Sequence, residues 1–428
     1  MKKMLIISGF ALLFFTNIVR AQFNSPNKQR DSSLVYITGE GTFINLGDPK
    51  GKGISVNLKT TLQPGFQYSR LDSTGGMSYT NRMSLNLARV ALTAKGFNDK
   101  MSLGIVTDFT GTSALLEGWV GFSFFRNHAK LTMGERQTNT NNRLALADER
   151  YQQTLAQTIA GKSSDGIAYG GLMQNFVGST REAGIFIETN FSWNKMRIYP
   201  SVSLTNGEGQ GLYDTIGTKY KYGGRIDIMP LGDFIKNNAF IADDIYREQK
   251  PKLAIGIAGS YNVKAYNSIG NGASNVTGIY NKSGVQDYAN YRKLIADFIF
   301  KYRGFSIVGE YINATVAGKN LYTNAGSSSR LTPDIASVQY GIGNGYNFQT
   351  SYILKNGLSF SGRYSYITPE SSNPASIIQK QNWYTFNINK YLKNNAVKIG
   401  LNTSYVNTQA PSVTTNKWIS NLAFQFLF

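Results

Sequence analysis

Apolar and polar residues alternate along this chain in segments of about ten residues, and this alternation limits its possible folds more than any other feature. In the last segment the apolar residues share one parity, at Trp418, Leu422, Phe424, Phe426 and Phe428. Asn421, Ala423 and Gln425 share the other parity. A period of two with one apolar face indicates β-strands whose sheet meets an apolar environment on one side and water on the other.

Two architectures satisfy this pattern, a water-soluble β-sandwich and a closed transmembrane barrel. Aromatic residues gather at segment ends, as interfacial girdles require, and the polar faces carry Gly, Ser, Asn and Lys rather than core residues. Short connections such as 97–99 and 303–304 alternate with long ones such as 206–218 and 265–290, as turns and outer loops do in outer-membrane barrels. We therefore predict an all-β fold, a transmembrane antiparallel barrel over residues 54–428, in the bacterial outer membrane.

Sixteen segments fit the strand pattern. They are 54–70, 77–96, 100–110, 115–125, 128–137, 181–190, 196–205, 219–229, 252–264, 291–302, 305–316, 337–354, 358–369, 381–392, 396–408 and 417–428. Asp165 to Met173 could form a further strand, but one more would make the count odd and invert the rhythm of short and long connections, so we expect a loop there. A barrel of about sixteen strands encloses a water-filled lumen.

The N-terminus has the pattern of a secretory signal peptide. Lys2 and Lys3 precede an apolar run over 4–15, and Ala21 supplies a small residue before a cleavage point. The run is too short to span a membrane, and no later run reaches the roughly 20 apolar residues of a spanning helix. We predict cleavage of 1–21 and a short N-terminal periplasmic segment over 22–53.

Composition argues against several classes of function. The chain has no cysteine and one histidine, His128, which leaves no basis for a disulfide framework, thiolate chemistry or a histidine-rich metal site. His128 lies beside a predicted turn, so we expect no enzyme, no metal and no cofactor. The formal charge is +19, but the basic residues are dispersed over alternating strands, so we expect no nucleic-acid partner. An energy-coupled transporter would need a larger N-terminal plug domain than 22–53 provides.

The connection 138–180, between the fifth and sixth predicted strands, is the longest in the chain. Connections of this length usually have a function. It carries both signs of charge, at Arg143, Asp148, Glu149 and Arg150. We predict that it folds into the lumen and narrows it; a loop that stays outside is the alternative.

Five short motifs occur in order between about residues 85 and 235. They are Leu87 to Leu92, Thr107 to Phe109 with Leu116 to Val120, Met133 to Gln137, Arg181 to Gly184, and Gly224-Arg225 with Met229-Pro230. Together they resemble the phosphate-selective porin O and P family. The resemblance implies a homotrimer of sixteen-stranded, anion-preferring channels. The loop lacks the dense arginine ladder of that family, so it leaves the solute open between phosphate and other oxyanions.

Basic residues outnumber acidic ones on the polar parity, which faces the lumen if the apolar parity faces lipid. The opposite orientation would place Arg or Lys in lipid, at a cost of about 2–4 kcal/mol each at mid-membrane. We expect a passive outer-membrane porin for small solutes, with small anions as preferred solutes; a scaffold barrel with a closed lumen is the alternative. The candidate pore-lining, anion-binding residues are Arg89, Lys130, Arg136, Arg197 and Arg225 on strands, and Arg143 and Arg150 in the loop.

Overall fold

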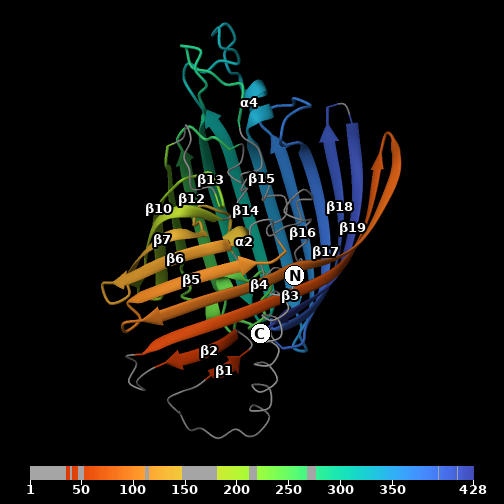
Figure 1. Cartoon of the computed structure of the whole chain (residues 1–428). Coiled ribbons are helices and arrows are strands. Elements are labelled where there is room, and N and C mark those ends of the chain that lie inside the picture. Colours follow the sequence, from red (N-terminus) through yellow and green to blue (C-terminus); the bar gives the residue numbers. More distant parts are fainter. Residues whose placement is uncertain are drawn as a thin grey trace, which may run out of the picture.

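The protein forms a closed antiparallel barrel of sixteen strands (Figure 1). The computed structural model describes residues 35–38, 41–46, 53–110, 115–146, 181–211, 219–267, 276–393, 395–411 and 413–428. The predicted signal peptide, 1–21, and the segment 165–173 lie outside the described residues. Among the described residues, no helix is long and apolar enough to cross a membrane.

The barrel strands follow one another around the ring in chain order. They are β3 (Ile54–Ser73), β4 (Gly76–Gly96), β5 (Met101–Asp108), β6 (Leu115–Phe124), β7 (Ala129–Gln137), β8 (Arg181–Thr189), β10 (Met196–Thr205), β11 (Lys221–Met229), β12 (Lys252–Asn262), β13 (Asn290–Tyr302), β14 (Phe305–Ala317), β15 (Gly343–Ile353), β16 (Leu358–Pro369), β17 (Lys380–Tyr391), β18 (Val397–Ala410) and β19 (Val413–Leu427). β19 pairs with β3 and closes the ring. The predicted all-β barrel and its strand number are confirmed.

Three short strands extend this ring. β9 (Phe191–Trp193) pairs with the start of β10, while β8 pairs with the rest of it. β1 (Val35–Thr38) and β2 (Gly41–Leu46) form a hairpin, and β2 pairs with the first residues of β3. The N-terminal segment 22–53, for which the sequence predicted no strand, therefore contributes a small extension to the sheet.

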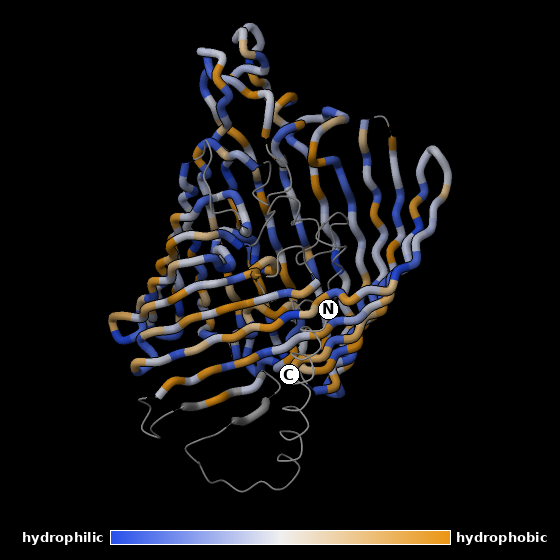
Figure 2. Tube along the Cα trace, viewed as in Figure 1, coloured by the Kyte–Doolittle hydropathy of each residue, from blue (hydrophilic) through white to orange (hydrophobic). Residues whose placement is uncertain are grey.

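The two faces of the wall have opposite character. Trp418 and Leu422 on β19 are exposed on the outside, whereas Asn421 and Gln425 face inward and are buried. Figure 2 shows apolar and polar residues alternating along the strands in this way. Outward-facing rings also form a row across β16 to β19, Tyr364–Tyr384–Tyr405–Trp418, with neighbouring centroids 5.1, 6.4 and 4.8 Å apart. An apolar exterior with a row of amphipathic rings fits the outer membrane and its interface with water.

The strand predicted over 337–354 begins later in the structure than the sequence pattern indicates. Residues Pro333–Gln339 form the helix α4, and β15 starts only at Gly343. The side chain of Thr332 caps the helix by accepting a hydrogen bond from the backbone N–H of Ile335, and Pro333 occupies the first turn. A capping threonine followed by proline is a helix start signal, which the alternation of apolar residues obscured.

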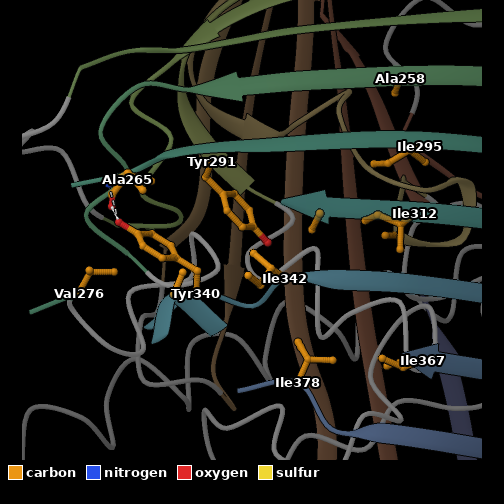
Figure 3. Packing of buried hydrophobic residues seen from close by; sticks show 14 of the residues in the cluster. Ala258, Ala265, Val276, Tyr291, Ile295, Ile312, Tyr340, Ile342, Ile367 and Ile378 are labelled. Carbon is orange, nitrogen blue, oxygen red and sulfur yellow. Dashed lines mark hydrogen bonds between the residues drawn. The ribbon is translucent and has the colours of Figure 1, made fainter. Parts of the chain in front are cut away.

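Apolar residues also fill part of the interior near the outer loops. Ile295, Ile312 and Ile367 face inward from β13, β14 and β16 and pack in one cluster with Tyr291 and Tyr340 (Figure 3). The hydroxyl of Tyr291 donates to the carbonyl of Gly341, and that of Tyr340 donates to the carbonyl of Ala265. The outer connections are thus tied to the inner wall on the side of β12 to β18.

Candidate functional site

The root of the long connection 138–180 enters the barrel. Residues 138–145 are buried, and the single-turn helix α2 (Arg143–Leu146) lies against the inner wall. Arg143 donates from Nε to Asp297 on β13 at 2.8 Å and from Nη2 to Asp227 on β11. The backbone N–H of Leu144 donates to Glu310 on β14 at 2.6 Å. The chain therefore crosses the lumen from the end of β7 to reach three distant strands, while residues 147–180, including Arg150, lie outside the described residues.

Arg143 and Arg225 share the same two carboxylates. Arg225 on β11 donates from Nε to Asp227 at 2.6 Å, and from Nη1 and Nη2 to Asp297, both at 2.8 Å. All four side chains are buried. Burying charge is costly, and pairing with well-placed hydrogen bonds offsets that cost. These two arginines therefore anchor the loop root to the wall.

A glycine on the neighbouring strand makes room for this cluster. A Cβ at Gly256 on β12 would collide with Nη2 of Arg225 and lie 2.5 Å from Oδ1 of Asp297. Because both groups are fixed by their mutual hydrogen bonds, neither can move away without breaking an ion pair. The ion-pair cluster thus depends on the absence of a side chain at Gly256.

A second element enters the lumen from the opposite end. The connection 230–251, between β11 and β12, contains the 3₁₀ helix η3 (Ile235–Phe240), and much of it is buried. Lys301 Nζ donates to Asn238 Oδ1 at 2.7 Å and to the carbonyls of Ile241 and Asp243 at 2.6 and 2.8 Å. The hydroxyl of Tyr391 on β17 donates to Asp243 at 2.6 Å. The connection 230–251 therefore runs along the inner wall from β11 to β17.

The two inward elements meet. α2 contacts η3, and Leu144 belongs to the same buried apolar cluster as Phe234 and Ala239. The sequence pattern suggested short turns at this end of the barrel, and 230–251 departs from that expectation. The apolar residues Phe234, Ile235, Phe240 and Ile241 within a polar connection were the signal that could have revealed a buried segment.

Open space remains between these elements and the wall formed by β3 to β11. One cavity of about 560 Å³ is bounded by the wall residues Lys130, Arg136 and Glu188 and by Leu146 and Phe240 from the two inward elements. A second of about 210 Å³ is bounded by Lys59, Arg89, Glu117 and Arg181. Gln137 at the end of β7 lines both. Between the described residues, each of these two cavities has room for a small solute.

The structure places most of the predicted anion-binding residues in ion pairs. Arg89 donates from Nη2 to Asp108 at 3.0 Å, and Arg136 donates from both terminal nitrogens to Glu188 at 2.9 Å. Arg197 pairs with Asp233 at 3.1 Å and is partly exposed. Arg225 and Arg143 share the pairs described above. Lys130 lies 4.6 Å from the ring centroid of Trp119.

The predicted residues therefore do not line one common site. Arg89 lines the smaller cavity, and Lys130, Arg136 and Arg225 line the larger one. Arg143 lies in the cluster with Arg225. Arg197 lines neither of the two cavities.

Sequence parity places Asp108, Glu117 and Asp227 on the inward faces, but Glu182 and Glu188 were missed. Glu182 and Glu188 share the inward parity of β8, where Glu182 accepts from Lys221 at 2.6 Å. Glu117 on β6 accepts from Arg181 at 2.9 Å. Parity alone could have placed both β8 glutamates in the lumen. Which base each one neutralises depends on neighbouring strands and could not be read from one segment.

The single histidine, His128, lies at the surface of the barrel. His128 is exposed in the turn after β6, and its Nδ1 contacts Asn190 Oδ1 at 2.9 Å. Among the described residues, no group of three or more His, Cys, Asp and Glu side chains is arranged to hold a metal ion.

Comparisons with known proteins bear on the fold. No protein-family model and no curated protein matches the chain, so the expected membership of the phosphate-selective porin O and P family is not confirmed. The anion-selective porin of Comamonas acidovorans is similar in structure, with a TM-score of 0.53, 11% identity, and coverage of 88% of this chain and 100% of that one.

Two further outer-membrane proteins are similar to a comparable degree. The channel DcaP of Acinetobacter baumannii has a TM-score of 0.52, 10% identity, and coverage of 90% and 99% of the two chains. A loop L8 deletion mutant of OmpT of Vibrio cholerae has a TM-score of 0.51, 11% identity, and coverage of 88% and 99%. At such identities the likeness shows a shared fold. The chain is a sixteen-stranded outer-membrane β-barrel with the fold of porins.

Proposed function

We propose that this protein is a passive channel that carries small solutes across the outer membrane and prefers anions. The observation that carries the proposal is the space left along β3 to β11, inside a closed barrel and between polar walls. A porin fold has such a passage when its inward loop leaves part of the lumen open. The fold shared with an anion-selective porin and an outer-membrane channel supports the same assignment.

The charge of the smaller cavity supports anion preference. Lys59, Arg89 and Arg181 line it, with Glu117 as the acidic residue among its lining. A passage lined in this way concentrates anions and repels cations. The carboxylates paired with Arg89 and Arg136 weaken this field locally. Solute binding should therefore be loose and its exchange fast, as conduction requires.

Planar-bilayer recording tests the proposal. Purified full-length protein should produce discrete current steps, and its reversal potential under a KCl gradient should have the sign of chloride preference. Replacing Arg89 with Gln should reduce that preference, because it removes a positive charge from the cavity wall. A cation-selective wild-type channel would contradict the proposed anion preference.

A scaffold barrel with a closed lumen is the second candidate. It is favoured by the packing of α2 against η3, which closes the lumen on the side of β11 to β14. Protein that folds as a heat-sensitive β-sheet in detergent but gives no current steps would support this candidate over the channel.

We also propose a homotrimer, on the family resemblance of the motifs between 85 and 235. Chemical cross-linking of unheated protein in mild detergent should give a species three times the mass of the heated chain. A monomer that resists cross-linking would overturn this assignment.

A further inference from the structure

Arg363 on β16 is a buried arginine. We call the side of its guanidinium that carries Nε and Nη2 the open edge. Its side chain faces the lumen and is 6% exposed. Among the described residues, neither Nε nor Nη2 has a hydrogen-bond partner. A buried charge without a partner is costly, so this guanidinium differs from the paired arginines elsewhere in the lumen.

The same edge of other arginines in this protein holds a carboxylate. Arg89 places Nε and Nη2 at 3.2 and 3.0 Å from Asp108 Oδ2. Arg225 places Nε and Nη2 at 2.6 and 2.9 Å from the two oxygens of Asp227. The two N–H groups of this edge point in parallel and match a planar pair of oxygens. At Arg363, no oxygen of the part of the chain that the structure describes accepts a hydrogen bond from this edge.

Polar side chains on β16 and on the strands beside it bond to one another. Ser365 donates to Asn347 at 2.7 Å, and Asn387 donates to Ser361 at 3.0 Å. On the adjacent strand, Thr385 shares a hydrogen bond with Ser404 at 2.9 Å. These uncharged side chains are therefore engaged in hydrogen bonds with one another.

Glu310 is the acidic group that acts on Arg363 electrostatically. Its carboxylate accepts from the backbone N–H of Leu144 at 2.6 Å and from Asn347 Nδ2 at 2.9 Å. It therefore does not occupy the open edge. Its negative charge opposes an incoming anion, and it opposes a dianion more strongly than a monoanion.

We propose that Arg363 is a solute subsite of the lumen that binds the carboxylate group of a small monoanionic organic acid, side-on through Nε and Nη2. This rests on the proposed channel function and adds a position on the wall opposite the cavities along β3 to β11. Binding supplies the planar acceptor that the guanidinium lacks. Repulsion from Glu310 keeps residence short, so the subsite assists passage and does not block it.

Competition between acetate and chloride tests this subsite in planar bilayers. Added potassium acetate should reduce the chloride current of wild-type protein in a saturable way, with inorganic phosphate much less effective. Arg363→Gln should raise the acetate concentration for half-maximal reduction by about tenfold or more, because a hydrogen bond to a charged group is lost. Arg363→Lys keeps the charge but not the paired donors, and should also lose most of the effect.

Arg292→Gln is the matched control. Arg292 lies on β13, faces outward and stacks on Tyr261 at 5.1 Å, so its replacement removes one positive charge without touching the lumen. It should behave as wild type. An acetate effect that Arg363→Gln leaves unchanged would overturn the subsite. Phosphate acting as strongly as acetate would overturn the choice of a monoanion.

A second measurement keeps the subsite separate from the channel proposal. Acetate should raise the unfolding temperature of wild-type protein in detergent but not that of Arg363→Gln, because a ligand stabilises the state that binds it. The variant deletes an uncompensated buried charge and should itself fold normally. Absence of current with retained acetate stabilisation would reject the channel alone; equal stabilisation of both proteins would reject the subsite.

Discussion

Gly256 shows how much of the interior depends on one absent side chain. The position lies on β12, and the guanidinium of Arg225 and the carboxylate of Asp297 occupy the space in front of it. Gly259, on the same strand, has its nearest neighbour at 3.6 Å, which is ordinary contact. The two glycines therefore differ in what a methyl group would meet.

Gly256→Ala should destabilise the barrel by about 1–3 kcal/mol, because overpacking displaces side chains that cannot relax. Gly259→Ala should change the stability little. The measurement is the urea concentration at half-unfolding, followed by the mobility difference between folded and unfolded barrel on gels. Equal effects of the two substitutions would show that the ion-pair cluster can shift at no cost.

Arg143 provides a second test at the scale of one side chain. Arg143→Ala would leave Asp227 and Asp297 with Arg225 as their remaining arginine partner, and would detach the loop root. Loss of one partner from a buried pair costs about 3–5 kcal/mol. Arg197→Ala removes a partly exposed pair with Asp233 and should cost about 0–1 kcal/mol. Unfolding in urea measures both, and a smaller loss for Arg143→Ala than for Arg197→Ala would contradict the anchoring role.

At the scale of elements, the lumen is shaped by two connections that fold inward from opposite ends. Replacing 233–249 with a short Gly-Ser turn should raise single-channel conductance several-fold. The segment that is hydrogen-bonded to Lys301 and Tyr391 would then no longer narrow the lumen. Excising 138–180 should do the same from the other end. Barrel closure should survive both changes, since the sixteen barrel strands lie outside both segments. Unchanged conductance after either change would mean that ions pass elsewhere.

An outer connection contributes a titratable contact. Glu208, between β10 and β11, accepts from the backbone N–H of Asn267 at 2.9 Å and from its side chain at 2.9 Å. Burial raises the pKa of Glu208 above its ordinary value of 4.5, although these hydrogen bonds act in the opposite direction. The native state therefore holds this proton more tightly than the unfolded chain does.

The stability that Glu208 contributes is fully present below the ordinary pKa of its carboxyl group. This stability is lost as pH rises through the raised pKa of the folded state. We expect Glu208→Gln to remove this part of the pH dependence. Urea unfolding of wild type and variant from acidic to neutral pH measures the difference in slope. Glu370→Gln, at an exposed position, is the control and should follow wild type. Parallel wild-type and Glu208→Gln curves would contradict the assignment.

At the scale of the whole molecule, anion preference should depend on salt. The sequence carries 44 basic and 25 acidic residues, and many inward-facing bases have an acidic partner. The proposed selectivity then depends on the surplus of positive charge, which acts through the water of the pore. Screening shortens the reach of charge from about 10 Å at 0.1 M salt to about 3 Å at 1 M. The chloride-to-potassium permeability ratio should therefore fall as salt is raised, as reversal potentials can show. A ratio independent of salt would point to binding at a single narrow site.

The sequence by itself determined the wall of this barrel. A period of two places Trp418 outside and Asn421 inside because side chains alternate along any strand, and the rhythm of connections predicted the strand number. These signals are local, so one sequence contains them. The capping signal at Thr332 is also local. The alternation of apolar and polar residues around it nevertheless led to the prediction of a strand where the structure has the helix α4.

Only the tertiary structure decided what lies within the wall. Arg143 and Asp297 are 154 positions apart, and Asp243 and Tyr391 are 148 apart. No local pattern states which strands face each other across a closed ring. The pairing of most predicted anion-binding arginines, the inward path of 230–251 and the open edge of Arg363 all follow from that closure. Charge on the inward parity could be predicted, but its partners could not, because neutralisation depends on which charges the closed ring brings together.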